Sequence, residues 1–196
     1  NMANSTYKIA FNRIIAVGPN GLFYSGNGTS WTKVTGIGDM SNPSIAFDNT
    51  TLVVAGKSGV FYSTDGTNYT TTTTTAIAAI NNTKRFTSMV RNTSGIYVAV
   101  GEDGIYYRDG GFWYTTNVID TDVRGSVYTD GSSFVIAGPG GIYYSSNGTS
   151  WTKVTGVGSM YGAALHYNGS LWVVAGSGGI YYSSNGTSWT KVTGVG

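Results

Sequence analysis

The sequence has no cysteine, one histidine, one glutamate and three prolines among 196 residues. The absence of cysteine excludes disulfides and thiolate metal sites, although it does not indicate a compartment. Charged residues make up only 10% of the chain, and a net charge of +2 without a Lys/Arg cluster argues against nucleic acid or anionic lipid as partner. No apolar run approaches the roughly 20 residues that span a bilayer, and Asn1 to Tyr7 lacks the features of a signal peptide. We therefore expect no membrane insertion, no cofactor and no metal.

What the sequence has in quantity is repetition. Ala137 to Gly158 and Ala175 to Gly196 are 22-residue stretches that differ only at Pro139 and Ser177. Repetition at a fixed period indicates one supersecondary unit packed against copies of itself. Five copies of a Gly-x-x-Gly turn, each followed by an aromatic pair, lead to a second aromatic anchor at Trp31, Tyr69, Trp113, Trp151 and Trp189. These anchors predict one domain of five units, at about 1–38, 39–80, 81–120, 121–158 and 159–196.

The residues within each unit predict strands. In the last copy, short runs rich in β-branched and aromatic residues are separated by turn sequences such as Asn168-Gly169, and they cover Gly162 to Tyr167, Leu171 to Ala175, Gly179 to Ser183 and Ser188 to Val192. Each unit is therefore expected to be a four-stranded antiparallel meander. Its second strand is apolar without alternation, which favours the two-sided burial of a propeller over the one-sided burial of a sandwich. The sequence thus predicts an all-β, five-bladed propeller whose ring is closed by packing of the first and last blades.

The segment before each anchor carries a family resemblance. Ser25-Gly26-Asn27-Gly28-Thr29-Ser30-Trp31 and its counterparts resemble the Asp-box (BNR repeat) of sialidase-type propellers, with a shorter version at Arg108 to Trp113. The resemblance implies a hairpin in which Asn or Asp caps its own turn and the aromatic packs back. A role in ligand binding is the alternative. The residues expected to serve this structural role are Asn27, Trp31, Asp65, Tyr69, Asp109, Trp113, Asn147, Trp151, Asn185 and Trp189.

Catalytic residues of the sialidases have no counterpart that can be placed here. The resemblance implies an arginine triad, a tyrosine nucleophile helped by a glutamate, and an aspartate acid/base, on a six-bladed ring. This chain has a single glutamate, Glu102, and its only histidine, His166, is expected to be packed or to line a channel rather than to act as a base. Asp120 and Asp122 offer too few oxygen ligands for a convincing calcium site. We therefore predict a non-catalytic member of this repeat family.

Differences between the copies indicate where a partner would bind. In a propeller meander the turns between strands 2 and 3 and the loops between blades share one face, and this face carries most of the variation. Thr70 to Thr83, which begins with six threonines, is the longest departure. We predict that this face binds the partner, with candidate residues Lys57, Glu102, Asp103, Arg124 and Tyr161.

A graded series of residues opens strand 2, at Ile14, Leu52, Tyr97, Phe134 and Trp172. Two interpretations stay open. The residues fill wedges between blades, where a large aromatic buries about 150–250 Å², or Tyr97, Phe134 and Trp172 form platforms on which sugar rings stack.

Three functions follow from these observations. The first is a recognition or attachment module, glycan-binding, on a phage particle or a cell surface, because low charge and an abundance of Thr, Ser, Asn and Gly suit an exposed repeat protein. The second is an assembly scaffold that binds a surface protein, and the third is a degenerate glycosidase. The sequence favours the first, in an extracellular or virion-associated monomeric ring.

Overall fold

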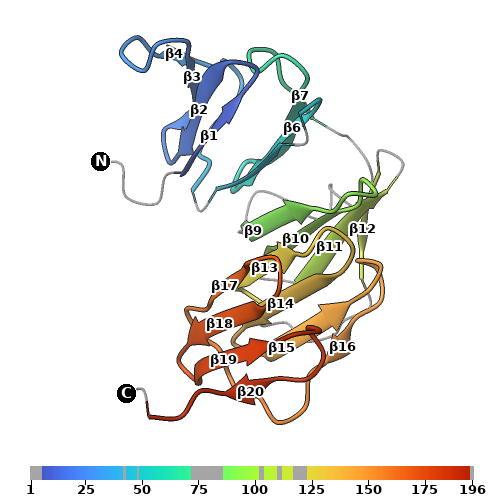
Figure 1. Ribbon diagram of the computed structural model, residues 1–196. Coiled ribbons are helices and arrows are strands. Elements are labelled where there is room, and N and C mark those ends of the chain that lie inside the picture. The colour runs from blue at the N-terminus through green and yellow to red at the C-terminus, as the bar shows by residue number, and fades with distance from the viewer. Residues whose placement is uncertain are drawn as a thin grey trace. The chain divides into compact units, whose positions relative to one another are not determined.

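The computed structural model describes residues 6–41, 43–47, 49–71, 86–101, 104–109, 112–116 and 123–194 (Figure 1). Every regular element in these ranges is a β-strand, and the strands form five four-stranded antiparallel sheets, each a meander in sequence order. The predicted all-β class and four-stranded repeat are confirmed. In the same ranges no helix is long and apolar enough to cross a membrane.

The chain divides into two compact units, residues 1–87 and 88–196. The first unit contains two sheets. The first sheet consists of β1 (Thr6–Ala10), β2 (Arg13–Gly18), β3 (Gly21–Ser25) and β4 (Thr32–Lys33). The second sheet consists of β5 (Ser44–Phe47), β6 (Leu52–Gly56), β7 (Gly59–Ser63) and β8 (Thr70–Thr71).

The second unit contains three more sheets, and the boundary between the units falls within β9. The third sheet consists of β9 (Phe86–Arg91), β10 (Tyr97–Gly101), β11 (Gly104–Asp109) and β12 (Phe112–Thr115). The fourth sheet consists of β13 (Ser126–Thr129), β14 (Phe134–Gly138), β15 (Gly141–Ser145) and β16 (Thr152–Lys153). The fifth sheet consists of β17 (Ala164–Tyr167), β18 (Trp172–Gly176), β19 (Gly179–Ser183) and β20 (Thr190–Lys191).

Two strands of the fifth sheet are shorter than the sequence predicts. β17 begins at Ala164 rather than Gly162, and β20 covers two residues rather than Ser188 to Val192. Ser188 lies outside the strand because its N–H donates to Asn185 Oδ1 within the preceding turn (2.9 Å). Hydrogen bonding within the turn therefore excludes Ser188 from the strand to which the sequence pattern alone assigns it.

Each sheet has two faces, which the alternation of the second strand defines. Residues of this strand are counted from the equivalent positions Ile14, Leu52, Tyr97, Phe134 and Trp172. We call the side of the second and fourth residues the forward face, and the side of the first and third residues the backward face. In the first unit, Ile15 and Val17 of the first sheet share a buried core with Leu52 and Val54 of the second. The forward face of one sheet is therefore covered by the backward face of the next.

The same packing rule holds twice in the second unit. Val98 and Val100 of the third sheet share a core with Phe134 and Ile136 of the fourth. Val135 and Ala137 of the fourth sheet in turn share a core with Trp172 and Val174 of the fifth.

Burial of the second strands confirms the predicted two-sided burial for β6, β10 and β14, which are buried along their whole length. The prediction is wrong for β2 and β18, where one face stays partly open. Closure into a ring, the boundaries of the five blades and a monomeric state stay predictions.

Candidate binding surface

The loop that enters each of three sheets is fixed by a buried apolar anchor. Met40, Val123 and Met160 occupy this position before the second, fourth and fifth sheets and are buried. The N–H of Met40 donates to the Gly18 carbonyl (3.2 Å), and the N–H of Met160 donates to the Gly138 carbonyl (2.9 Å). Met40 and Met160 thus tie their loops to the end of the preceding sheet.

The residue after the anchor differs in each loop. It is half-buried Ser41 before the second sheet, exposed Arg124 before the fourth, and Tyr161 before the fifth, where the side chain is 68% exposed. In each loop a buried apolar residue is therefore followed by a residue that varies between the loops and is more exposed. This is the pattern expected of a surface whose framework is fixed and whose contacts vary.

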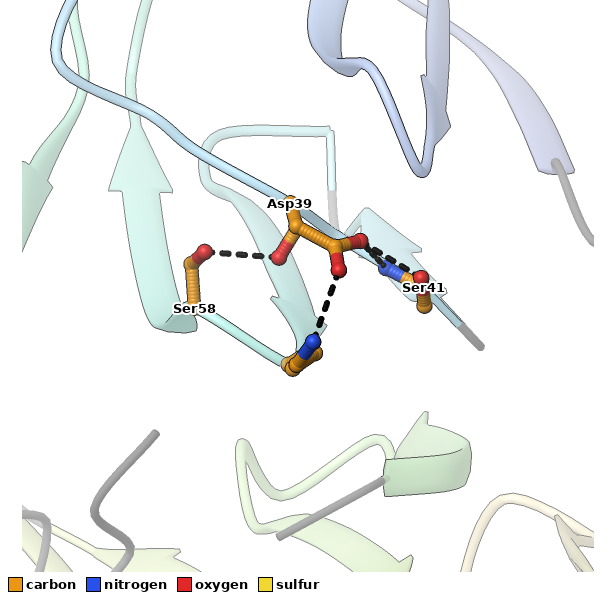
Figure 2. A network of polar contacts seen from close by, with 4 residues as sticks. Asp39, Ser41 and Ser58 are labelled. Atoms are coloured by element: carbon orange, nitrogen blue, oxygen red, sulfur yellow. Dashed lines mark hydrogen bonds and ion pairs between the residues drawn. The ribbon is translucent and has the colours of Figure 1, made fainter. Parts of the chain in front are cut away.

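In the first unit this loop is held by a polar network centred on Asp39 (Figure 2). The Asp39 carboxylate accepts hydrogen bonds from the N–H of Ser41 (2.8 Å) and from its hydroxyl, and it pairs with Lys57 Nζ at 3.0 Å. The Ser58 hydroxyl donates to the Asp39 carbonyl (2.6 Å). Hydrogen bonds from Ser41, and then from Lys57, hold the pKa of Asp39 below its usual value. Lys57, predicted to contact a ligand, thus lies at the predicted face with its ammonium paired.

In the second unit Ser177 fixes the corresponding loop without any charge. Its hydroxyl accepts from the N–H of Tyr161 (2.9 Å) and donates to the Ser159 carbonyl (3.3 Å), while its own N–H donates to the Tyr161 carbonyl (3.1 Å). Ser58 and Ser177 occupy different positions in their turns, yet both hydroxyls donate to the carbonyl of the residue before the anchor. Tyr161 is therefore exposed on a backbone that is tied on both sides.

The predicted aromatic platforms are not exposed. Tyr97, Phe134 and Trp172 are fully buried, and their rings pack between neighbouring sheets or against charged side chains of their own sheet. A ring without an accessible face offers no surface to a sugar, so sugar stacking at these three residues is wrong and the wedge-filling interpretation describes them. All three open strand 2 and stand on the backward face of their sheets, and for Phe134 and Trp172 that face meets the preceding sheet.

Four other candidate residues lie outside the described residues, and their predicted roles stay predictions. They are Glu102, Asp103, Asp120 and Asp122. Arg124 is exposed, in the variable position described above. Over the described ranges, no three His, Cys, Asp or Glu side chains gather where they could hold a metal ion.

His166 is exposed on the forward face of the fifth sheet, opposite Val173. Its ring meets that of Tyr128 edge-to-face, with 4.8 Å between the ring centres. The structure places His166 at the margin between an aromatic contact and solvent, and the packed or channel-lining role that the sequence indicates stays a prediction.

The turns that resemble the Asp-box, which we call Asp-box turns for this resemblance alone, form the hydrogen bonds that the structural interpretation expects. In the first sheet, Asn27 Oδ1 accepts from the N–H groups of Thr29 (3.0 Å) and Ser30 (2.9 Å), and the Trp31 indole N–H donates to the Gly28 carbonyl (3.1 Å). The same pattern recurs around Asn147 with Trp151 and Asn185 with Trp189. These side chains are engaged inside their own hairpins.

The second and third sheets vary this turn. Asp65 replaces Asn in the second, and its carboxylate also accepts from the side-chain amide of Asn68 (2.7 Å), while the Tyr69 hydroxyl lies 3.4 Å from the Gly66 carbonyl. The backbone and side-chain donors of Asn68, then the N–H of Thr67, hold the pKa of Asp65 far below its usual value. Burial, and then the charge of Asp65, raise the pKa of Tyr69. In the shorter turn of the third sheet, Asp109 pairs with Phe112 across the strands, and Trp113 is buried.

Sequence reasoning missed the Asp39 network and the exposed apolar side chains Tyr7, Ile9, Val173 and Tyr182. The sequence did contain a signal for the Asp39 network. Asp39 stands at the position that Ser159 occupies in the loop before the fifth sheet, and an oppositely charged residue, Lys57, lies in the turn that follows Asp39. The sequence contained no signal for the exposed apolar side chains, since they occupy positions that are buried or half-buried in other copies.

Comparisons with known proteins identify the fold. No family model and no curated protein matches the chain. Among solved structures, an ancestral GH74 enzyme matches with a TM-score of 0.67 at 18% identity, over 93% of this chain and 30% of that one. The extracellular domain of BT4673 from B. thetaiotaomicron matches with a TM-score of 0.66 at 16% identity, over 97% of this chain and 28% of that one.

A third solved structure, YCF48 from Cyanidioschyzon merolae, matches with a TM-score of 0.60 at 15% identity, over 93% of this chain and 69% of that one. The chain thus spans less than a third of the first two neighbours and about two thirds of YCF48. These neighbours are β-propeller proteins, and the likeness shows that the five sheets belong to this type of fold.

Proposed function

We propose that the protein is a non-catalytic recognition module, on a cell surface or a phage particle, whose variable loops bind a neutral glycan. The observation that carries this proposal is Tyr161, an aromatic side chain 68% exposed on a loop that Met160 anchors and Ser177 ties. An exposed tyrosine offers an apolar ring face for a sugar and a hydroxyl for its polar groups. Because the loop is already ordered, binding costs little conformational entropy.

The environment of three acidic groups, Asp39, Asp65 and Asp130, suits a structural role better than acid catalysis. A glycosidase needs one carboxylic acid with a raised pKa to protonate the leaving group. Asp39, Asp65 and Asp130 instead accept several hydrogen bonds from their own turns, and the pKa of each is lowered. At Asp130 burial raises the pKa, but the hydrogen bonds from Ser133 and Ser132 outweigh it. These three carboxylates stay ionised at neutral pH and stabilise their own loops by accepting hydrogen bonds.

The neighbours in fold are compatible with this proposal. They include a GH74 enzyme, a glycosidase, and the extracellular domain of BT4673, so the same arrangement of sheets serves carbohydrate chemistry and surface sensing elsewhere. At 16–18% sequence identity these neighbours support the fold alone. The proposal that the ligand is a glycan therefore depends on Tyr161.

The proposal is tested by glycan-array screening followed by calorimetric titration of the best ligand. Tyr161→Ser is the informative variant, because serine occupies the equivalent position at Ser41 and keeps the loop compatible with the fold. We expect affinity to fall about tenfold or more, equivalent to about 1.4 kcal/mol. Tyr114→Ser is the matched control, since Tyr114 is also exposed but lies on strand β12. Silence across a broad array, or equal binding by wild type and Tyr161→Ser, would overturn the proposal.

A further inference from the structure

Five Asn-Gly pairs occur in the chain, and they begin at Asn20, Asn27, Asn147, Asn168 and Asn185. Such a pair is chemically labile, because glycine has no Cβ to shield its main-chain nitrogen from the side-chain amide carbon of the asparagine before it. Bond formation between these two atoms expels ammonia and converts the asparagine. All five asparagines are exposed, so exposure does not separate them. Their hydrogen bonds, however, differ.

In the Asp-box turn of the first sheet, both reacting groups are already engaged. Asn27 Oδ1 accepts from the N–H groups of Thr29 (3.0 Å) and Ser30 (2.9 Å). It also accepts from the hydroxyl of Ser25 (3.2 Å). The N–H of Gly28, which carries the attacking nitrogen, donates to Ser25 Oγ (2.8 Å). Ring closure at Asn27 must therefore break hydrogen bonds of both partners.

Three further Asn-Gly pairs are held in similar ways. Asn147 and Asn185 each accept from two main-chain N–H groups of their turn, and the N–H of the following glycine donates to the serine of the turn at 2.8 Å in both. Asn168 is held less completely. Its Oδ1 accepts from the N–H groups two and three residues ahead, at 3.0 and 2.8 Å. His166, however, stands where the Asp-box turns have serine, so the hydroxyl for the glycine N–H is missing.

Asn20 lies in a different kind of turn, between β2 and β3. Over the part of the chain that the structure describes, its side chain takes part in no hydrogen bond or ion pair. At the equivalent position of the second sheet stands Ser58, whose hydroxyl donates to the Asp39 carbonyl. Packing of the glycine does not set this site apart, because a Cβ added at Gly21 would lie 3.0 Å from the Ile37 carbonyl oxygen. The difference from the other four sites is the amide without a hydrogen bond.

We propose that Asn20 is a modification site, at which the folded protein loses the side-chain amide while the asparagines of the Asp-box turns stay intact. The Gly21 nitrogen bonds to Asn20 Cγ, and ammonia leaves, formed from the side-chain NH₂ and the proton of the Gly21 N–H. Water then opens the resulting succinimide ring at either carbonyl carbon, which gives aspartate or isoaspartate. The reaction needs only water, and hydroxide accelerates it because it takes up the Gly21 proton.

The rates at the five sites follow from the bonds that ring closure breaks. At Asn20 it disturbs the pair of Gly18 and Gly21 at the end of the hairpin, while the amide itself is free to turn. At Asn27 it breaks the bonds of the amide oxygen as well as that of the attacking nitrogen. We therefore expect Asn20 to react about tenfold faster or more in the folded chain, with Asn168 between the two.

The modification changes the predicted binding face. Asn20 lies in a turn between strands 2 and 3, as Lys57 and Ser177 do in their own sheets. Each conversion adds one negative charge, so the net charge falls by one from +2. Isoaspartate also lengthens the main chain of the turn by one carbon and so disturbs the pairing of β2 with β3. This turn therefore gains charge as the molecule ages, without any enzyme.

Peptide mapping by mass spectrometry tests the proposal on the wild-type chain. The protein is incubated at mildly alkaline pH, once folded and once in urea, and is then cleaved with trypsin. Cleavage after Arg13 and Lys33 releases one peptide that contains both Asn20 and Asn27, so fragmentation compares the two sites directly. In urea they should react at similar rates, because the same dipeptide is then free at both. In the folded chain Asn20 should lead by about tenfold or more.

Two variants identify the cause. Ser25→Ala removes the hydroxyl that holds the Gly28 N–H, so Asn27 should react faster, while Asn147 in the same molecule keeps its own serine and its rate. Asn20→Ser removes the reacting amide, so the main acidic species that ion-exchange chromatography separates from aged wild type should be absent. Circular dichroism spectra check that both variants are folded.

Equal rates at Asn20 and Asn27 in the folded wild type would overturn the proposal, and so would reaction of Asn168 before Asn20. An unchanged rate at Asn27 in folded Ser25→Ala would overturn the explanation by hydrogen bonding. The same holds if aged Asn20→Ser forms as much acidic species as wild type. These measurements involve no glycan, so their failure is distinct from failure of the function proposed for Tyr161.

Discussion

Asp65 is the single acidic residue among the four longer Asp-box turns, whose other members are Asn27, Asn147 and Asn185. Its pKa is lowered from 3.8 in the folded chain, because Asn68 and Thr67 donate hydrogen bonds to the carboxylate. A lowered folded pKa adds stability above the unfolded pKa, and this contribution is lost as the pH falls below about 3.8 towards the folded value. Asparagine makes the same turn without titrating.

We therefore predict that Asp65→Asn reduces the acid sensitivity of unfolding. The urea midpoint of the first unit's transition, measured at pH 7, 5 and 3, should fall less between pH 5 and 3 in the variant than in wild type. Asn147→Asp is the reciprocal control and should increase the acid sensitivity of the fourth sheet, to which Asp130 already contributes. Equal pH dependence of all three proteins would contradict this explanation.

At the residue scale, the hydrogen bonds of these turns could be predicted from the sequence because they are local. Asn or Asp bonds the N–H groups two and three residues ahead, and this geometry needs no knowledge of the rest of the chain. The fate of Trp172 could not be predicted in the same way. Its burial depends on the fourth sheet, and a large aromatic suits an exposed platform and a buried wedge equally well.

At the scale of the element, the Asp-box hairpin has two functions. It closes strands 3 and 4, and it packs its glycine on the preceding sheet. A Cβ at Gly148 would lie 3.0 Å from Val98 Cγ2, 3.1 Å from Ile96 Cγ2 and 3.1 Å from Phe134 Cε2, whereas nothing lies within 4 Å of one at Gly156. The two glycines have nearly the same positive φ, +77° and +80°.

This pair separates backbone strain from crowding. We predict that Gly156→Ala costs about 1–2 kcal/mol, because an L-residue must adopt a left-handed conformation. Gly148→Ala should cost about 1–3 kcal/mol more, because the added methyl group also overfills the contact between the third and fourth sheets. Equilibrium urea unfolding of the second unit's transition measures both. Equal losses in the two variants would show that the hairpin tip contributes no inter-sheet packing.

The elements themselves were largely predictable, because strand runs alternate with Gly- and Asn-rich turns at a fixed period. The ends of the short fourth strands were less predictable from the sequence. Ser188 has strand-like neighbours, but its N–H is already used by the turn, and this competition is visible only once the hydrogen bonds are known.

At the scale of the whole molecule, the near-identical fourth and fifth copies form an internal comparison. Their sequences match at 21 of 22 positions from Ala137 and Ala175 onward, and Val135 and Val173 just before this stretch are also the same. Differences in the exposure of these forward-face residues therefore arise from their surroundings. β14 is buried on both faces, and β18 is open on its forward face. This asymmetry was not predictable from the sequence, because repetition implies equal environments for equal residues.

We predict that this asymmetry appears in native-state amide hydrogen exchange. Amides of β14 and β15 should exchange more slowly than the equivalent amides of β18 and β19, because local opening of a sheet with one open face breaks fewer apolar contacts. At low micromolar concentration the difference should reach about tenfold or more, equivalent to about 1.4 kcal/mol. Equal protection of the two sheets in dilute solution would mean that the forward face of the fifth sheet is already covered within a single chain.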